Sequence, residues 1–260
     1  MLAGVSAPVA WSIVQRQGDA LETRFASQKT QTKQVDRFRE NAATIKTPEA
    51  LLKDRRTLQF VLESYGLESE INKTAILRKL MTEDPDADSS LANQMTDQRY
   101  RQFARDFSKW GEAVPFEKSG ALDTIVERWQ TAQYEKQLGE DVSGLREALY
   151  FQRNAPSASS VLQLMSDSAL ALVLRVGLGL PSQFSSLDFD QQRAVLEDRV
   201  DLTTFSDSKK LDSFLRRFLI RYEQEYGDAG NSNPVASLIS SDGSTDGLYS
   251  LLGSTLNLSV

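Results

Sequence analysis

One stretch of the chain, from Thr47 to Met81, occurs twice, and this repetition constrains the fold more than any other feature. Thr47 can cap a helix with its hydroxyl, and Pro48 suits the first helical position because its missing N–H has no intrahelical partner there. The apolar residues that follow recur at steps of seven, four and three, namely Leu51, Leu58, Leu62 and Tyr65. This spacing predicts one amphipathic helix that begins after Thr47.

A glycine corner is predicted to end this helix. If Gly66 adopts the left-handed conformation, Leu67 is placed to pack back on Leu62 and to complete a Schellman-type cap. Asn72 is then the predicted cap of a second helix, which continues to the Asp-Pro pair at 84–85. We therefore expect two short helices that meet at a fixed corner.

The second copy lies 113 positions further along the chain. Three features keep this offset without a gap: Leu51 matches Leu164, Asp54 matches Asp167, and Gly66-Leu67 matches Gly179-Leu180. Further on the offset becomes 111, where Phe103 and Phe107 match Phe214 and Phe218. We interpret this pattern as an internal duplication of a helical unit.

The periodicity predicts an all-α fold, a multi-helix bundle built from two duplicated helical units. The predicted parts are a helical N-terminal arm, two helical repeat units and a flexible or loosely docked tail, at 1–37, 38–139, 140–226 and 227–260. Within 15–44 we expect one long exposed helix. A further helix is expected near 122–139, followed by another from 145 towards Pro156.

Several repeated residues have predicted structural roles. The aromatic stripe that contains Phe103 and Phe107 has helical spacing, and its counterpart with Phe214 and Phe218 supports a core role for both stripes. Asp54 and Asp167 are open to two interpretations. They could pair across a pseudo-twofold axis, or, as we favour, each could anchor its helix to a nearby Arg or backbone N–H.

The composition excludes several kinds of chemistry. The chain has neither Cys nor His, which removes disulfides, thiolate nucleophiles, the usual general base and the commonest metal ligand. The net charge is -6, and no Lys or Arg cluster exceeds a pair or a short helical face. We interpret such pairs, for example Arg55-Arg56, as solvated helix faces, and we expect no nucleic-acid binding.

No membrane insertion and no cofactor are expected. The apolar residues near the N-terminus lack the positive region of a secretory signal, and no apolar run approaches the ~18 residues of a membrane span. Asp84, Asp86 and Asp88 alternate like the first ligands of a calcium loop. Ser89 stands where that loop needs Gly, however, and Met95 where it needs Glu, so no metal site is predicted.

Four segments, read in order, resemble one known family. They are FRENAATIKTPEALLKDRRTLQFVLESYGL, SLANQMTDQRYRQFARDF, GLREALYFQRNAPSASSVLQLMSDSALALVLRVGLGLP and LDSFLRRF, within residues 38–222. The chain resembles the bacterial family catalogued as domain of unknown function 1217, found mainly in alphaproteobacteria and often encoded among flagellar genes. The resemblance implies a flagellum-associated protein, and it implies no activity, cofactor or catalytic residue.

Three hypotheses about function follow. The first is a non-enzymatic interaction or assembly protein of the bacterial flagellum, with protein partners and a cytoplasmic or exported location. The second is a cytoplasmic scaffold or chaperone-like adaptor that offers an apolar groove between the two copies. The third, more remote, is an enzyme that uses carboxylates and Arg alone, which would require acids with strongly perturbed pKa values in a pocket.

Overall fold

Every regular element within residues 2–227, the part of the chain that the computed structural model describes, is a helix. The predicted all-α class is therefore confirmed. The α-helices are α1 (Ala7–Ala26), α2 (Lys29–Ala42), α3 (Pro48–Lys53), α4 (Arg55–Ser64), α5 (Thr74–Thr82), α6 (Leu91–Gln94), α7 (Gln98–Phe107), α8 (Ala121–Asp141), α9 (Leu145–Asn154), α10 (Val161–Ser166), α11 (Ser168–Gly177), α12 (Phe189–Arg199), α13 (Thr203–Ser206) and α14 (Ser208–Tyr226). Short 3-10 turns are η1 (Glu68–Asn72), η2 (Pro115–Glu117), η3 (Ala155–Ser157) and η4 (Ser182–Ser186).

The buried side chains form two separate clusters. The first core takes residues from α2 to α7 and from the first half of α8. The second core takes residues from α1, from the second half of α8 and from α9 to α14. Helix α8 thus contributes Ile125, Val126 and Trp129 to the first core and Tyr134 and Leu138 to the second. One unbroken helix belongs to both cores.

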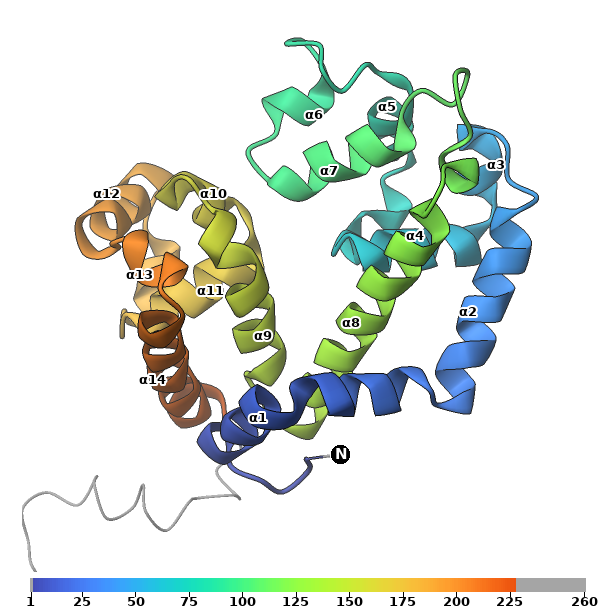
Figure 1. Cartoon of the computed structure of the whole chain (residues 1–260). Coiled ribbons are helices and arrows are strands. Elements are labelled where there is room, and N and C mark those ends of the chain that lie inside the picture. Colours follow the sequence, from blue (N-terminus) through green and yellow to red (C-terminus); the bar gives the residue numbers. More distant parts are fainter. Residues whose placement is uncertain (1, 228–260) are drawn as a thin grey trace, which may run out of the picture.

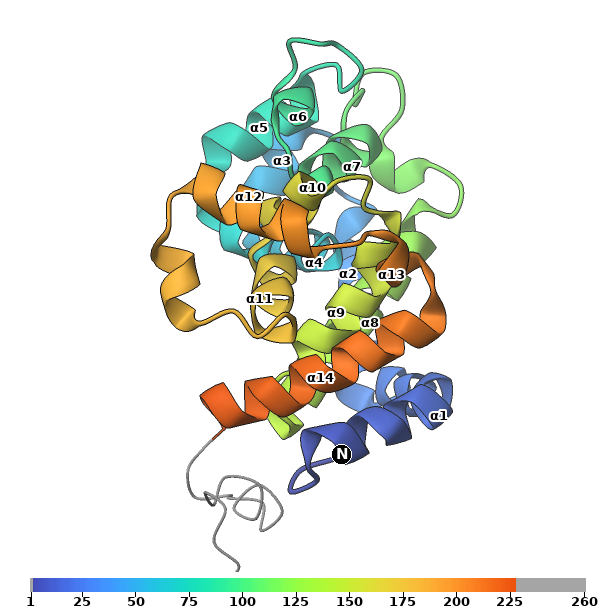
Figure 2. The same ribbon diagram turned by 90° about the vertical axis from the view of Figure 1, so that its left-hand side faces the viewer.

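The two sets of helices stand side by side above a shared base. In Figure 1, α1 and the lower end of α8 lie at the base, with α9 to α14 on the left and α2 to α7 on the right. The view turned by 90° places α1 beside α14, and these two helices are in contact (Figure 2). Helix α8 packs against α4 in one set and against α9 in the other.

An aspartate interrupts each of the two copies of the predicted corner helix. We predicted one helix from Pro48 to the corner, and this is wrong, because Asp54 ends α3 and caps α4. Asp167 lies between α10 and α11 in the same way. An Asp side chain bonds readily to nearby backbone N–H groups and so competes with the continuous helical ladder.

Two other predicted helix boundaries need correction. The long helix expected within 15–44 is divided at Ser27, which ends α1 before α2 begins at Lys29. Asn72 is not the cap of α5, since Lys73 holds that position without a side-chain bond. The Asn72 side chain instead accepts a hydrogen bond from Arg55 Nη2 at 3.0 Å.

The N-terminal helices join the two cores rather than extending from them. Trp11 and Val14 of α1 are buried in the second core, and Val35 of α2 is buried in the first. The segment 1–37 predicted as an arm is therefore shared between the cores. The predicted tail, apart from Gly227, lies outside the described residues.

Candidate functional site

The two predicted corner aspartates act on the first turns of their helices. Asp54 Oδ1 accepts hydrogen bonds from the backbone N–H groups of Arg56 and Thr57, at 3.2 and 3.1 Å. Asp167 Oδ1 accepts from the N–H groups of Ala169 and Leu170, at 2.8 and 3.4 Å. Each carboxylate therefore satisfies donors that an α-helix leaves without intrahelical partners. This agrees with the anchoring interpretation.

The two glycine corners share one backbone geometry. Gly66 and Gly179 have φ of 67° and 69°, in the left-handed region where a side chain is strained. Leu67 N donates to the Leu62 carbonyl at 2.8 Å, and Leu180 N donates to the Arg175 carbonyl at 2.9 Å. These are the long bonds of Schellman caps, and Leu67 and Leu180 are buried as predicted.

The remaining predicted structural residues take the roles expected of them. Thr47 Oγ1 accepts a hydrogen bond from Ala50 N at 3.1 Å and caps α3. Each of the four predicted core phenylalanines is at most 3% exposed, namely Phe103, Phe107, Phe214 and Phe218. These residues build the two cores and do not form a site. Common descent of the two halves stays a prediction, which the matching corners support.

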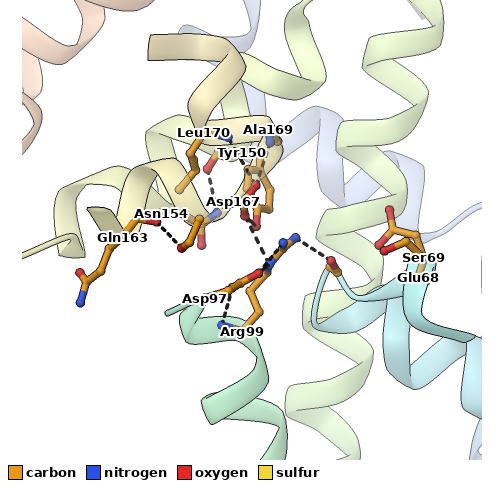
Figure 3. Close-up of polar contacts among 12 residues, drawn as sticks. Glu68, Ser69, Asp97, Arg99, Tyr150, Asn154, Gln163, Asp167, Ala169 and Leu170 are labelled. Atoms are coloured by element: carbon orange, nitrogen blue, oxygen red, sulfur yellow. Dashed lines mark hydrogen bonds and ion pairs between the residues drawn. The ribbon is translucent and has the colours of Figure 1, made fainter. Parts of the chain in front are cut away.

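A polar cluster joins the two sets of helices, and we call it the junction cluster. It consists of Gly66, Asp97, Arg99, Tyr150 and Asp167. Arg99 Nη1 donates to the Gly66 carbonyl at 2.7 Å, and its Nη2 donates to Asp97 Oδ2 at 2.7 Å. Arg99 Nε lies 3.3 Å from Asp167 Oδ2, which also accepts the Tyr150 hydroxyl at 2.6 Å. Figure 3 shows Arg99 bonded to Asp97, the N-cap of its own helix, and directed towards Asp167 across the junction.

The surroundings of the junction cluster keep Tyr150 and Arg99 protonated. Burial and the Asp167 charge raise the pKa of Tyr150 well above its usual value, so its hydroxyl stays protonated and donates. Burial alone would lower the pKa of Arg99, but the hydrogen bond to Asp97 and nearby charges raise it. A second contact, Arg146 Nη2 to Glu68 Oε1 at 2.8 Å, also links the two sets. The polar groups of this junction are matched to one another, which indicates a structural connection.

Another ion pair joins α9 to α8, between the exposed Arg153 and the buried Glu135. Arg153 of α9 donates from Nε and Nη2 to the two carboxylate oxygens of Glu135 on α8, at 3.1 and 2.9 Å. Burial raises the pKa of Glu135, and the Arg153 charge opposes that rise. The fork of Arg matches the carboxylate in two parallel bonds, so the pair fixes α9 against α8.

A basic groove opens between α2, α4 and α8, with a volume of 870 Å³. The four cations in its lining are all exposed, namely Lys33, Arg37, Arg56 and Lys136. Among the described residues that line it, Glu63 alone is acidic. The Glu63 carboxylate accepts hydrogen bonds from Trp129 Nε1 at 2.8 Å and from Gln133 Nε2 at 2.9 Å. The groove therefore presents a surplus of positive charge.

The floor of the basic groove is a column of aromatic rings. Phe38 stacks on Phe60 with ring centroids 4.1 Å apart, and Phe60 stacks on Trp129 at 4.3 Å. One ring comes from each of α2, α4 and α8. Stacked rings of this kind give a rigid base. The cations on its rim are thus carried by helices that are fixed against one another.

Sequence patterns did not identify several residues that form the junction cluster and the basic groove. Arg99 and Tyr150 carried no motif, and their partner Asp167 is distant in the sequence from Arg99. Arg56 was interpreted as part of a solvated helix face, which is correct for its exposure but omits the cations of α2 and α8 beside it. Amphipathic spacing places residues on one helix and does not say which helices come together.

The described residues contain no group of three or more acidic, His or Cys side chains that could hold a metal ion. The aspartates at 84–88 lie in a turn, where Asp84 Oδ1 accepts a hydrogen bond from Asp86 N at 3.1 Å. Within residues 2–227, no helix combines the length and the apolar character that a membrane crossing requires.

Within residues 2–227, the protein combines helices packed around two cores with a polar junction and a basic groove. The family described as "Protein of unknown function (DUF1217)" matches residues 64–211, and the chain belongs to this family. The matched segment includes all five residues of the junction cluster. The resemblance noted from the sequence is therefore confirmed.

A solved structure has the same fold. It is the crystal structure of protein AGR_C_984 from Agrobacterium tumefaciens, a structural-genomics target. The two sequences are 26% identical, the TM-score is 0.72, and the match covers 85% of this chain and 97% of the other. Among curated proteins, none matches the chain.

Proposed function

We propose that the protein is a non-enzymatic interaction or assembly protein that binds an acidic segment of a protein partner in the basic groove. The observation that carries this proposal is the unbalanced charge of the groove. Its cations Lys33, Arg37, Arg56 and Lys136 form no ion pair within residues 2–227, although other Arg and Lys residues do. Like charges gathered on one concave surface attract an oppositely charged partner and speed its association.

The fixed base of the groove supports this role. Because the rings of Phe38, Phe60 and Trp129 pack α2, α4 and α8 together, the cations need not be brought into place when a partner binds. Preorganised groups lose less conformational freedom on binding than mobile ones do. Long Lys and Arg stems can also cover apolar parts of a bound segment while their charged ends contact its carboxylates.

The junction cluster favours a non-enzymatic role. Its tyrosine hydroxyl, its carboxylates and its guanidinium are bonded to one another, and the raised pKa values of Tyr150 and Arg99 keep both groups protonated near neutral pH. A general acid or base functions best with a pKa near the working pH. The contacts across the junction are also polar, which does not favour the adaptor hypothesis of an apolar groove between the copies.

The flagellar part of the proposal rests on the family. Members of that family are often encoded among flagellar genes, and the chain belongs to the family. The partner we expect is a flagellar component with an exposed acidic segment, met in the cytoplasm or during export.

A deletion strain of a motile host tests the two parts separately. The deletion is complemented with the wild-type chain, with a groove variant (Lys33→Glu, Arg37→Glu, Arg56→Glu and Lys136→Glu) and with a control variant (Lys79→Glu and Arg105→Glu). The control changes two exposed cations outside the groove. We expect the groove variant to lose more than half of the restored swimming and the control to retain it, at equal protein levels.

Each part of the proposal has its own contrary result. If deletion leaves swimming and filament assembly unchanged, the flagellar assignment is wrong. If the groove variant restores swimming as well as the wild type does, the groove is not the binding surface. Circular dichroism and thermal unfolding of the purified variants show whether each one is folded.

A further inference from the structure

A second groove, which we call the apolar groove, lies between α11, α12 and η4. Its volume is 550 Å³, and the large apolar residues that line it are Met165, Leu172, Phe184, Phe189 and Leu196. Two large apolar side chains stand exposed at this part of the chain, Leu187 at 40% and Phe189 at 52%. Exposed apolar side chains gathered beside a groove are typical of a binding surface.

The groove exists because α12 packs less completely than its counterpart in the first set. Helix α5 buries Leu77, Leu80 and Met81 in the first core. Helix α12, at the same place in the order of elements, buries Leu196 alone among its described residues. The second core is therefore less completely covered at α12 than the first core is at α5.

The described chain ends beside this groove. Arg175 of α11 lines the groove, and its guanidinium donates to Glu225 Oε1 at 2.8 Å and to the Tyr226 hydroxyl at 2.5 Å. Arg175 is itself buried, at 4% exposure. These contacts hold the last turn of α14 against the wall of the groove. The described residues therefore end at the wall of the groove.

The sequence of that segment fits an apolar surface. Residues 228–260 contain three aspartates and no Lys, Arg or Glu, and four large apolar residues lie together at Leu248, Tyr249, Leu251 and Leu252. The 21 residues between Tyr226 and Leu248 can span up to about 70 Å when extended, so the cluster can reach the groove. A tether of this length also keeps the cluster at an effective concentration on the order of millimolar.

We propose that residues 248–252 of the same chain occupy the apolar groove and cover Phe189, Leu172 and Met165. This inference concerns a different surface from the basic groove and does not depend on the proposed function.

Methionine methyl groups provide a direct test on the full chain. The sequence has four methionines, of which Met165 lines the apolar groove and Met81 is buried in the first core. Because the chain has no Cys, a single Ser250→Cys substitution accepts one nitroxide label without background. With 13C-methyl methionine, we expect the nitroxide to reduce the Met165 signal more than twofold relative to the reduced label and to leave Met81 unchanged.

A matched variant and a truncation complete the experiment. Adding Leu248→Ser, Leu251→Ser and Leu252→Ser to the labelled chain should restore the Met165 signal, because serine side chains do not bind an apolar groove. These changes lie outside the described helices and should leave the fold intact. A chain that ends at Gly227 should show a shifted Met165 signal and an unshifted Met81 signal. An unaffected Met165 in both measurements would overturn the proposal. So would broadening that passes from labelled to separate 13C-labelled chains, because a second copy would then be the occupant.

Discussion

Asp54 and Asp167 hold the same place in the two corners, yet they use their carboxylates differently. Both accept the backbone N–H groups of the following turn with Oδ1. Asp54 Oδ2 accepts the Thr57 hydroxyl of its own helix at 3.0 Å. The position equivalent to Thr57 is Leu170, which has no hydroxyl, and Asp167 Oδ2 bonds to Tyr150 and Arg99 instead. One local substitution thus accompanies the change of a helix cap into a link between the two sets of helices.

The largest effect expected from this comparison is on Asp167. Asp167→Ala removes a cap and leaves Tyr150 and Arg99 without their shared carboxylate, so we expect a loss of about 2 to 4 kcal/mol in the free energy of unfolding. Asp54→Ala, the matched change, removes a cap and one local bond and should cost about 1 kcal/mol. Urea denaturation of the two variants measures the difference, and equal losses would show that the junction contacts add nothing.

Exchanging one residue between the corners should have the next largest effect. Ser64 and Gly177 are equivalent positions, and a Cβ on Gly177 would overlap the ring of Phe214 at Cζ. Gly177→Ser should therefore cost about 1 to 3 kcal/mol, because the buried ring must move. The reverse change, Ser64→Gly, should cost about 1 kcal/mol through the lower helix propensity of Gly. Thermal unfolding of both variants tests this order, and a neutral Gly177→Ser would contradict it.

Substitutions of the two corner glycines should differ by less in the stability that they cost. Gly66→Ala and Gly179→Ala both place a side chain at positive φ, at a cost of about 1 kcal/mol. At Gly179 the added Cβ would also lie 3.1 Å from Arg221 Cζ, whereas at Gly66 the nearest atom would be 3.5 Å away. We expect Gly179→Ala to be the more destabilising variant, by less than about 1 kcal/mol. Chemical denaturation measures the difference, and the opposite order would show that Arg221 moves aside freely.

Loss of the Tyr150 hydroxyl should have an effect no larger than that of the glycine substitutions. Tyr150→Phe should cost about 1 kcal/mol near pH 7. Burial and the Asp167 charge raise the folded-state pKa of Tyr150, so its stabilising contribution is complete below the unfolded pKa of 10.0 and is lost as pH rises above it. The difference between wild type and Tyr150→Phe should therefore shrink above pH 10. Denaturation at pH 7 and 10.5 measures it, and a constant difference would contradict the assignment.

Much of the fold could be predicted from local sequence patterns. The apolar stripes gave the helical class, and the Gly-Leu pairs gave both corners, because a left-handed glycine and a following buried leucine are determined within a few residues. The breaks at Asp54 and Asp167 were missed. Both residues lie within continuous apolar spacing, and the competition between an Asp side chain and the helix backbone leaves no periodic signal.

The junction cluster and the basic groove both depend on contacts between segments that are distant in the sequence. Arg99 and Asp167 come from different sets of helices, and the cations of the basic groove come from three helices. Hydrophobic spacing fixes which face of each helix is buried and leaves the neighbouring helix undetermined. The aromatic residues were correctly placed in the core. Their column at the base of the groove, however, follows only from the packing of α2, α4 and α8.

Helix α8 couples the unfolding of the two cores, because it contributes side chains to both. Trp129 and Tyr134 lie little more than one turn apart on this helix and belong to different cores. Unfolding of either core therefore exposes apolar side chains at the edge of the other core. Heating should therefore produce a single calorimetric transition, with equal van't Hoff and calorimetric enthalpies. A destabilising change confined to one half of the molecule would then increase the rate at which the other half unfolds as well.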